Sequence, residues 1–198
     1  MPSPLTIRPD ALSRPAPTAR NPRQGASHND ALDTVDREAF LHAMSHTVSG
    51  VNVVTTDGPG GRFGLTVSAM TSLSADPPML LVCIHRQGPL CAAIHANHRF
   101  GVNVLADCQH HVSGTFSGRP ERGVAYAFAP HDWARNRFGT PRLHGAVAHF
   151  DCDLEAAHDY GSHTLFVGLV RAAAGDGGTP LLYSQRTYGH PHLRTHAA

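Results

Sequence analysis

The sequence predicts a mainly β fold, a closed antiparallel barrel with a few short helices. Its longest strand-like segments stand in pairs joined by turns, which is typical of antiparallel hairpins. The helical segments between the strands are few and short, so alternating βαβ units are not indicated. No GxGxxG sequence follows a strand, and a nucleotide-binding doubly wound sheet is therefore not supported.

The first half of the ordered chain supplies a helix, a hairpin and a buried strand. The helix is expected to begin near Asp33 or Thr34, since either residue can cap it. Residues 51–70, VNVVTTDGPGGRFGLTVSAM, predict two strands around a turn rich in glycine and proline. Residues 79–85, MLLVCIH, predict a buried strand. A rough apolar stripe on the helix consists of Val35, Phe40, Ala43 and Met44.

The second half continues in the same style. Pro89 suits the first turn of a short helix, PLCAAIHAN, and FGVNVLA predicts the next strand. QHHVSGTFSG is compatible with a helix that Gly114 weakens, and residues 118–142 are expected to be irregular, anchored by Trp133 and Phe138. Residues 146–175 predict a long hairpin that turns around Asp159-Tyr160-Gly161, and PLLYSQRTY predicts one final strand.

Composition and charge exclude several functional classes. The formal net charge is +1, which indicates no nucleic-acid partner, and no apolar run is long enough for a membrane span. All sixteen basic residues are arginines, so no lysine can hold pyridoxal phosphate or a nucleotide phosphate in a Walker loop. Residues 1–30 contain few apolar side chains and predict a disordered tail, followed by one folded domain over residues 31–198.

Cysteine and histidine do not form a convincing metal site. The four cysteines lack CxxC spacing and are expected to be free thiols in a reducing cytoplasm. Two helix-spaced groups offer ligands in principle. However, such pairs arise easily in a chain with sixteen histidines, and no metal is expected. These groups are His42 with His46, and Cys91 with His95 and His98.

The stretch RFGLTVSAMTSLSADPPMLLVCI, residues 62–84, gathers uncharged polar groups at the end of a strand. Thr66, Ser68 and Met70 share one face of that strand. Backbone N–H groups are released where the chain leaves a sheet, and with hydroxyls they suit a planar heterocycle or a phosphate. The same residues are also compatible with a plain solvent-facing strand and turn.

Three blocks of this chain together resemble the flavin reductase family, the small reductases that accompany two-component flavin-dependent monooxygenases. They are GLTVSAMTSLSADPPMLLVCI, NHRFGVNVL and YGSHTLFVGLV, and the resemblance covers roughly residues 37–191. It implies an FMN-binding split barrel that forms a homodimer. It also implies reduction of FMN or FAD by NADH or NADPH, with delivery of reduced flavin to a monooxygenase partner.

The resemblance assigns flavin contacts residue by residue. It places the flavin on Ser68, Ala69, Met70, Thr71 and Ser72, with Cys83 and Ile84 as neighbours. Arg99 and Phe100 match the stretch before the next strand, where Arg99 could approach a phosphate or be an ordinary solvated arginine.

The nicotinamide side of the resemblance is less complete. Relatives often read Gly-Asp-His where this chain has Gly161-Ser162-His163, and the family reading places His163 beside the nicotinamide. Ser162 removes a carboxylate that could orient the imidazole, and His163 is also compatible with a plain turn residue. The C-terminal Tyr/Arg run is partial as well, with Tyr188 as its expected cofactor contact.

Hydride transfer needs positioning more than a general base, which agrees with a sequence that shows no catalytic carboxylate pair. Two alternatives remain open at this point. One is a flavin-retaining oxidase on the same barrel, and the other is a non-catalytic flavin-binding module.

Overall fold

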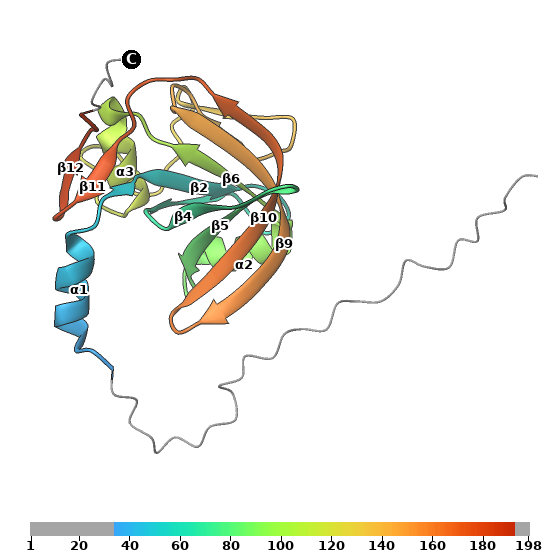
Figure 1. Cartoon of the computed structure of the whole chain (residues 1–198). Helices are drawn as coiled ribbons and strands as arrows, with labels where there is room; N and C mark the ends of the chain where they lie inside the picture. The colour runs from blue at the N-terminus through green and yellow to red at the C-terminus, as the bar shows by residue number, and fades with distance from the viewer. Residues whose placement is uncertain (1–33, 193–198) are drawn as a thin grey trace, which may run out of the picture. The chain divides into compact units, whose positions relative to one another are not determined.

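A seven-stranded antiparallel sheet dominates the structure, a computed structural model that describes residues 34–192 (Figure 1). The elements from Arg37 onward form one compact unit; the preceding one, Met1–Asp36, is described only from residue 34. The strand order is β3-β2-β6-β9-β10-β5-β4. The strands are β2 (Asn52–Thr56), β3 (Phe63–Val67), β4 (Met70–Ala75), β5 (Pro78–His85), β6 (Arg99–Val104), β9 (Ala148–Tyr160) and β10 (His163–Gly175).

The prediction of a mainly β chain with a few short helices is confirmed. The two predicted hairpins pair as β2 with β3 and as β9 with β10. The long hairpin turns at Gly161, whose φ of +56° is a left-handed conformation that glycine adopts readily. Closure is a different matter, because β3 and β4 stand at the two ends of the strand order and no ladder joins them within residues 34–192.

Three helices and a single 3₁₀ turn accompany the sheet in the described part. They are α1 (Arg37–Ser45), α2 (Pro89–Asn97), η1 (Asp107–Gln109) and α3 (His110–Phe116). α2 matches its predicted segment, since Pro89 opens it and His98 ends it in a left-handed conformation. α1 begins a few residues later than expected, so Thr34 lies outside it and Asp33 outside the described residues. The expected tail, residues 1–30, is also outside them.

The C-terminal segment corrects a prediction. PLLYSQRTY is not one strand but two short strands, β11 (Leu182–Ser184) and β12 (Thr187–Gly189), which form a sheet with β1 (Ser49–Gly50). Gln185 and Arg186 form the loop between them, with φ of 49° and 62°. Two consecutive left-handed residues reverse the chain within two positions. Glycine or asparagine usually occupies such positions, so a glutamine and an arginine did not indicate a turn.

The irregular segment 118–142 contains a small two-stranded sheet, β7 (Trp133–Arg135) paired with β8 (Pro141–Leu143). Trp133 is a buried anchor as predicted, packed in a T-shaped contact with Phe116 of α3. Phe138 is only partly buried.

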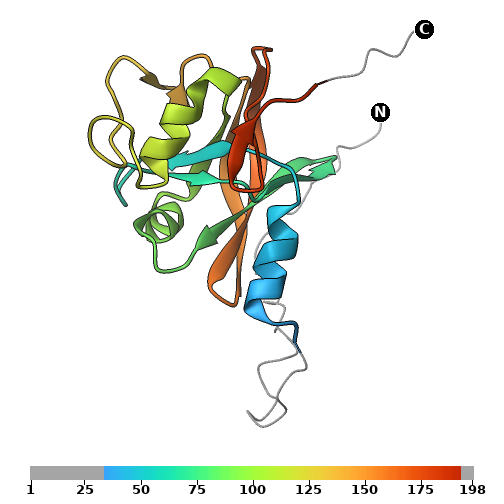
Figure 2. The same ribbon diagram turned by 90° about the vertical axis from the view of Figure 1, so that its left-hand side faces the viewer.

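Apolar side chains pack on both faces of the sheet. Leu90 and Ile94 of α2 join one cluster, whereas Val112 and Phe116 of α3 join the other. Figure 2 shows α2 and α3 on opposite sides of β2 and β3. The space between β2, β3 and α3 is where polar residues gather. None of the helices in the described part is both long and apolar enough to cross a membrane.

Candidate functional site

The predicted hydroxyl row lies where the chain passes from β3 to β4. Ser68, Thr71 and Ser72 are exposed, and Met70 is half-buried. The crossing is held by the backbone, since the Met70 N–H donates to the Ser68 carbonyl and the Cys83 N–H donates to the Ala69 carbonyl, both at 3.1 Å. β4 is an end strand of the sheet, so alternate backbone amides on its outer side face away from β5.

A groove of about 540 Å³ opens beside this row. The groove has three sides. Val51, Val67 and Ser68 line the first, α3 lines the second, and the β11–β12 hairpin lines the third. The remaining lining residues are Thr66, His110, Ser113, Gly114, Ser117, Arg119, Glu121, Tyr183, Arg186 and Tyr188. Two residues from the predicted flavin set, Ser68 and Tyr188, therefore meet in one cavity.

Hydrogen bonds between elements hold the groove's walls together. Thr66 Oγ1 of β3 donates to the Ser113 carbonyl of α3 at 2.8 Å. The Ser113 hydroxyl and the Tyr188 hydroxyl lie 2.9 Å apart, which links α3 to β12. The Tyr183 and Tyr188 rings also contact each other, with centroids 5.4 Å apart. The groove is thus assembled from three parts of the chain that are far apart in sequence.

A glycine-rich turn brings Arg119 to the groove. The chain folds back after α3, and the Arg119 N–H donates to the Gly114 carbonyl at 2.8 Å. A Cβ at position 114 would lie 2.9 Å from the Arg119 carbonyl oxygen, so glycine is needed for this approach. In the sequence, the segment SGTFSGRPERG carries a signal for this site, since small and hydroxyl residues before an arginine suit an anion.

The groove is more basic than the chain as a whole. Arg119 and Arg186 face it, and among the described residues no acidic side chain forms an ion pair with either. Its one carboxylate, Glu121, lies 3.4 Å from His110 Nε2. Hydroxyls and two uncommitted guanidinium groups are the donors that a phosphorylated ligand requires.

The tip of the β9–β10 hairpin carries His163. Its ring is exposed, and its Nδ1 lies within hydrogen-bonding distance of the Ser162 hydroxyl, at 2.9 Å. The His163 ring also packs against the His85 ring, with centroids 5.4 Å apart. The tip is held in place by Arg86, whose Nη2 lies 3.0 Å from Asp159 Oδ2. β5 connects this tip to the hydroxyl row, because His85 pairs with His163 and nearby Cys83 bonds to Ala69.

The structure does not bring every predicted residue to the groove. Ile84 and Phe100 are fully buried core residues, so their side chains have no surface for a cofactor. Arg99 is the first residue of β6 and does not line the groove. Its Nη1 donates to the Phe138 carbonyl at 2.6 Å. Arg119 and Arg186, not Arg99, are the arginines of the groove.

The helix-spaced metal candidates show ordinary contacts. The His42 and His46 rings meet edge to face at 4.7 Å, and His46 Nδ1 donates to the His42 carbonyl. Cys91 is buried, with its Sγ 3.5 Å from Thr164 Oγ1, and His95 packs on Phe166. Within residues 34–192, no three histidine, cysteine or acidic side chains form a group suited to a metal ion.

A second polar cluster lies buried around Asp151, on the side of β6 and β9 that segment 136–143 covers. Asp151 Oδ2 lies 3.0 Å from His149 Nε2, and both side chains are about 5% exposed. Asn136 Nδ2 and Thr140 Oγ1 also donate to this carboxylate. Burial raises the pKa of Asp151, but the hydrogen bonds from His149, Thr140 and Asn136 and the charge of His149 outweigh it and lower the pKa.

The imidazole of His149 is held at both nitrogens. Asn103 Oδ1 accepts from the Leu143 N–H at 2.8 Å and lies 3.1 Å from His149 Nδ1, so Nδ1 must be a donor. Nε2 lies 3.0 Å from Asp151 Oδ2 and 3.2 Å from Asn136 Nδ2. The buried His149–Asp151 pair thereby fastens segment 136–143 to the sheet. Every polar group in it is used within the protein.

One buried polar atom near the groove lacks a partner. Asn52 Oδ1 is the one fully buried side-chain oxygen or nitrogen without a hydrogen bond among the described residues. Asn52 pairs with Val67, the last residue of β3 before the hydroxyl row. An unpaired buried acceptor is costly, but Asn52 does not line the groove.

Comparisons with known proteins agree on one family. A sequence model described as "Flavin reductase like domain" matches residues 44–192. The FMN reductase (NADH) RutF 1 of Methylorubrum extorquens is 42% identical over 163 residues, covering 82% of this chain and 80% of that protein. The FMN reductase (NADH) RutF of Variovorax paradoxus is 39% identical over 150 residues, covering 75% and 82%.

Solved structures are similar in fold as well as in sequence. BorF, the flavin reductase component of a bacterial two-component tryptophan halogenase, is 31% identical with a TM-score of 0.71, covering 80% of this chain and 100% of that one. The NADH:FAD oxidoreductase SgcE6 of Streptomyces globisporus, in complex with NAD and FAD fragments, is 29% identical with a TM-score of 0.70, covering 82% and 93%.

Proposed function

Because this chain belongs to the flavin reductase family and is an NAD(P)H:flavin oxidoreductase, we propose that it transfers a hydride from NADH to FMN. We propose further that it releases the reduced flavin to a flavin-dependent monooxygenase. The observation that carries the proposal is the groove beside Ser68, with its hydroxyls, its two aromatic rings and its two unpaired arginines. Similarity to proteins named FMN reductase (NADH) supports the choice of flavin and of nicotinamide.

The residues of the groove fit a flavin mononucleotide in chemistry and size. A volume of about 540 Å³ is within the range of small-ligand sites. Arg119 and Arg186 would hold the phosphate, since guanidinium groups match its oxygens. The Ser68–Ser72 backbone and hydroxyls would meet the polar edge of the ring system. When bound, the flavin supplies the hydride-accepting chemistry.

The protein's own residues position and shield rather than transfer protons. Tyr183 and Tyr188 cover one side of the groove and would keep water from a bound ring. The Ser162 hydroxyl lies 2.9 Å from His163 Nδ1 and would orient the imidazole. His163 would thereby hold the nicotinamide in place. Correct positioning supplies much of the rate acceleration in such a transfer.

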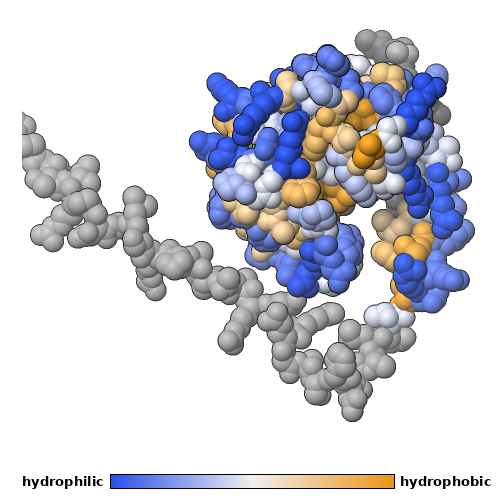
Figure 3. Space-filling view, turned by 180° about the vertical axis from the view of Figure 1, so that it is seen from behind, coloured by the Kyte–Doolittle hydropathy of each residue, from blue (hydrophilic) through white to orange (hydrophobic). Residues whose placement is uncertain are grey.

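We also propose a homodimer in which α1 contacts the second copy. The polar face of α1, including Arg37 and His42, lies toward the β11–β12 loop. Its apolar residues Phe40 and Met44 are 51% and 49% exposed on the other face. Figure 3, seen from behind, shows apolar surface on this helix open to solvent. A helix that turns its polar side to its own chain suits a partner on its apolar side.

Light scattering checks the oligomeric state. We expect a dimer at micromolar concentration, and Phe40→Ser should shift it toward the monomer because it removes the centre of the apolar face. A wild-type monomer with full activity would contradict this arrangement.

Three further points stay proposals. We propose that β3 and β4 approach each other across residues 68–69 as the seam of a split barrel.

We propose that residues 31–198 are the folding domain, so a chain beginning at Asp30 should keep a cooperative thermal transition. Loss of that transition would contradict this proposal. The four free cysteines support a cytoplasmic location.

The decisive test follows NADH and NADPH oxidation with added FMN, FAD or riboflavin. We expect turnover with NADH that depends on free FMN, and faster substrate oxidation when a flavin-dependent monooxygenase shares the solution. A tightly held flavin that reacts directly with oxygen would indicate the oxidase alternative. Bound flavin that ignores both nicotinamides would indicate a non-catalytic module.

A further inference from the structure

A second cavity adjoins the flavin groove. It has a volume of about 570 Å³ and lies between the polar face of α1 and the β11–β12 loop. Arg186 lines both this cavity and the groove, so the two meet at one guanidinium group. The lining residues are Arg37, Glu38, Leu41, His42, Ser45, His46, Gln185 and Arg186.

The side chains of this cavity favour an anion. Two arginines and two histidines face one carboxylate, that of Glu38. Their spacing along α1 places them on one side of the helix. This polar side faces the rest of the chain, where it contributes little to packing. Because His46 Nδ1 donates to the His42 carbonyl at 2.9 Å, its Nε2 is directed away from the helix backbone. The cavity therefore presents donors that the helix itself does not use.

The loop that closes the cavity keeps side chains where glycine would be less strained. Gln185 and Arg186 have φ of 49° and 62°, and glycine or asparagine usually occupies both positions of such a two-residue loop. Strained residues of this kind cluster at functional sites. The Gln185 N–H donates to the Ser45 carbonyl at the end of α1 at 2.6 Å, which joins the two walls. The strain thus positions Arg186 between the two cavities.

We propose that this cavity binds the adenosine diphosphate moiety of a dinucleotide, an inference that rests on the proposed function. The pyrophosphate would lie between Arg37 and Arg186, and the adenine would lie against Leu41 and His42. The two cavities, of about 570 and 540 Å³, adjoin at Arg186, and a dinucleotide is a ligand whose two halves are joined through phosphates. NADH and FAD share this moiety, so the experiment must tell them apart.

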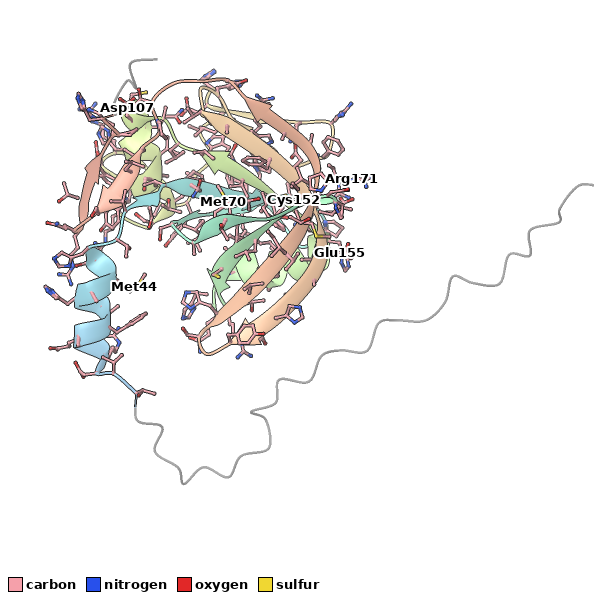
Figure 4. All side chains as sticks on the ribbon, in the orientation of Figure 1. Met44, Met70, Asp107, Cys152, Glu155 and Arg171 are labelled. Atoms are coloured by element: carbon pink, nitrogen blue, oxygen red, sulfur yellow. The ribbon has the colours of Figure 1, made fainter. Side chains whose placement is uncertain are left out.

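The variants are Arg37→Ala and His42→Ala in the full chain, with Arg171→Ala as the control that also removes one arginine. Arg171 is exposed, pairs with Asp153 at 3.4 Å and lies away from Met70 and α1 (Figure 4). Arg37 and His42 are exposed on α1, so both variants should fold, which a thermal melt confirms.

Binding of ADP alone is the first measurement and does not depend on activity. We expect isothermal titration to show equal binding to the wild type and to Arg171→Ala, at least fivefold weaker binding to Arg37→Ala, and weaker binding to His42→Ala. Absence of ADP binding at millimolar concentration, or equal binding in all four proteins, would overturn the proposal whether or not the enzyme reduces flavin.

Kinetics and flavin binding then identify the dinucleotide. If the site serves NADH, Arg37→Ala raises the KM for NADH at least fivefold but leaves the KM for reduced nicotinamide mononucleotide within twofold. If the site serves FAD, the variant weakens FAD binding and spares FMN. Equal changes for each whole and truncated ligand would overturn the assignment. Failure of the wild type to oxidise either nicotinamide would instead reject the proposed function.

Discussion

The groove beside Ser68 and the buried cluster around Asp151 are both built from polar residues, yet they differ in whether those residues find partners within the protein. In the cluster, His149, Asn136 and Thr140 all bond to one carboxylate, and both nitrogens of the imidazole are used. In the groove, Arg119 and Arg186 have no acidic partner among the described residues. Polar groups that bond to one another stabilise the fold, whereas charged groups without a partner at a cavity are free to bind a ligand.

Removing the charge at the centre of the buried cluster should have the largest effect. Asp151→Asn removes the buried carboxylate that His149, Asn136 and Thr140 contact, and breaking a buried pair by removing one partner typically costs about 3–5 kcal/mol. Urea unfolding should show this loss of free energy of unfolding. The exposed Asp153→Asn, which loses only its contact with Arg171, should cost less than about 1 kcal/mol. Equal losses in the two variants would mean that the cluster is not a structural unit.

The same carboxylate should shape the acid side of the stability profile. Because folding lowers the pKa of Asp151, the unfolded chain binds more protons near the ordinary value of about 3.9. The stability from this group is therefore present above that pH and is lost as the pH falls through the lower folded pKa. Thermal melts between pH 7 and pH 2 should show wild type and Asp151→Asn converging at the acid end. A constant difference would contradict the lowered pKa.

The groove should lose ligand affinity, not stability. Arg119→Ala removes a charge-assisted contact of about 1.5–3 kcal/mol, which is roughly a 10- to 100-fold loss of FMN affinity. Riboflavin lacks the phosphate, so its binding should change less than twofold. Fluorescence titration of both flavins measures this. An equal loss for the two would place Arg119 elsewhere than at the phosphate.

A change at the tip of the β9–β10 hairpin should affect the use of NADH, not stability or flavin affinity. His163→Ala is expected to raise the KM for NADH or slow single-turnover flavin reduction by about tenfold, since positioning of the nicotinamide is lost. Flavin affinity should stay near the wild-type value. His158→Ala on the same hairpin is also exposed and serves as the control. Weakened flavin binding with a normal KM for NADH would show that the two sites have been exchanged.

The smallest effect is expected from a single hydroxyl. Ser72→Ala removes one neutral hydrogen bond of about 0.5–1.5 kcal/mol, which weakens flavin binding about two- to tenfold and leaves the rate at saturating flavin unchanged. Ser74→Ala is the control, because its hydroxyl already accepts from the Asp76 N–H at 3.2 Å. If both variants bind flavin like the wild type, the row is a plain polar turn.

Local patterns gave most of the fold. Strand alternation, the glycine turns and Pro89 predicted the β2–β3 and β9–β10 hairpins and α2. The β11–β12 loop escaped because Gln185 and Arg186 adopt a conformation that their residue types disfavour. Barrel closure depends on how far a sheet curls, which no local pattern encodes.

The site was only half predictable for a related reason. The hydroxyl row is continuous in sequence, so it could be recognised. Arg119, Ser113 and Arg186 reach the groove from separate elements, and only the three-dimensional fold brings them together. Arg99 does not line this groove and its Nη1 donates to the Phe138 carbonyl, so its contact with a phosphate stays a prediction.

An FMN titration of Arg119→Ala and Asp151→Asn side by side, at a temperature where both are folded, tests the division between the two regions most directly. We expect Arg119→Ala to bind FMN 10- to 100-fold more weakly with an unchanged melting temperature. We expect Asp151→Asn to bind FMN like the wild type although it melts at a lower temperature. Weakened binding in Asp151→Asn with normal binding in Arg119→Ala would contradict it.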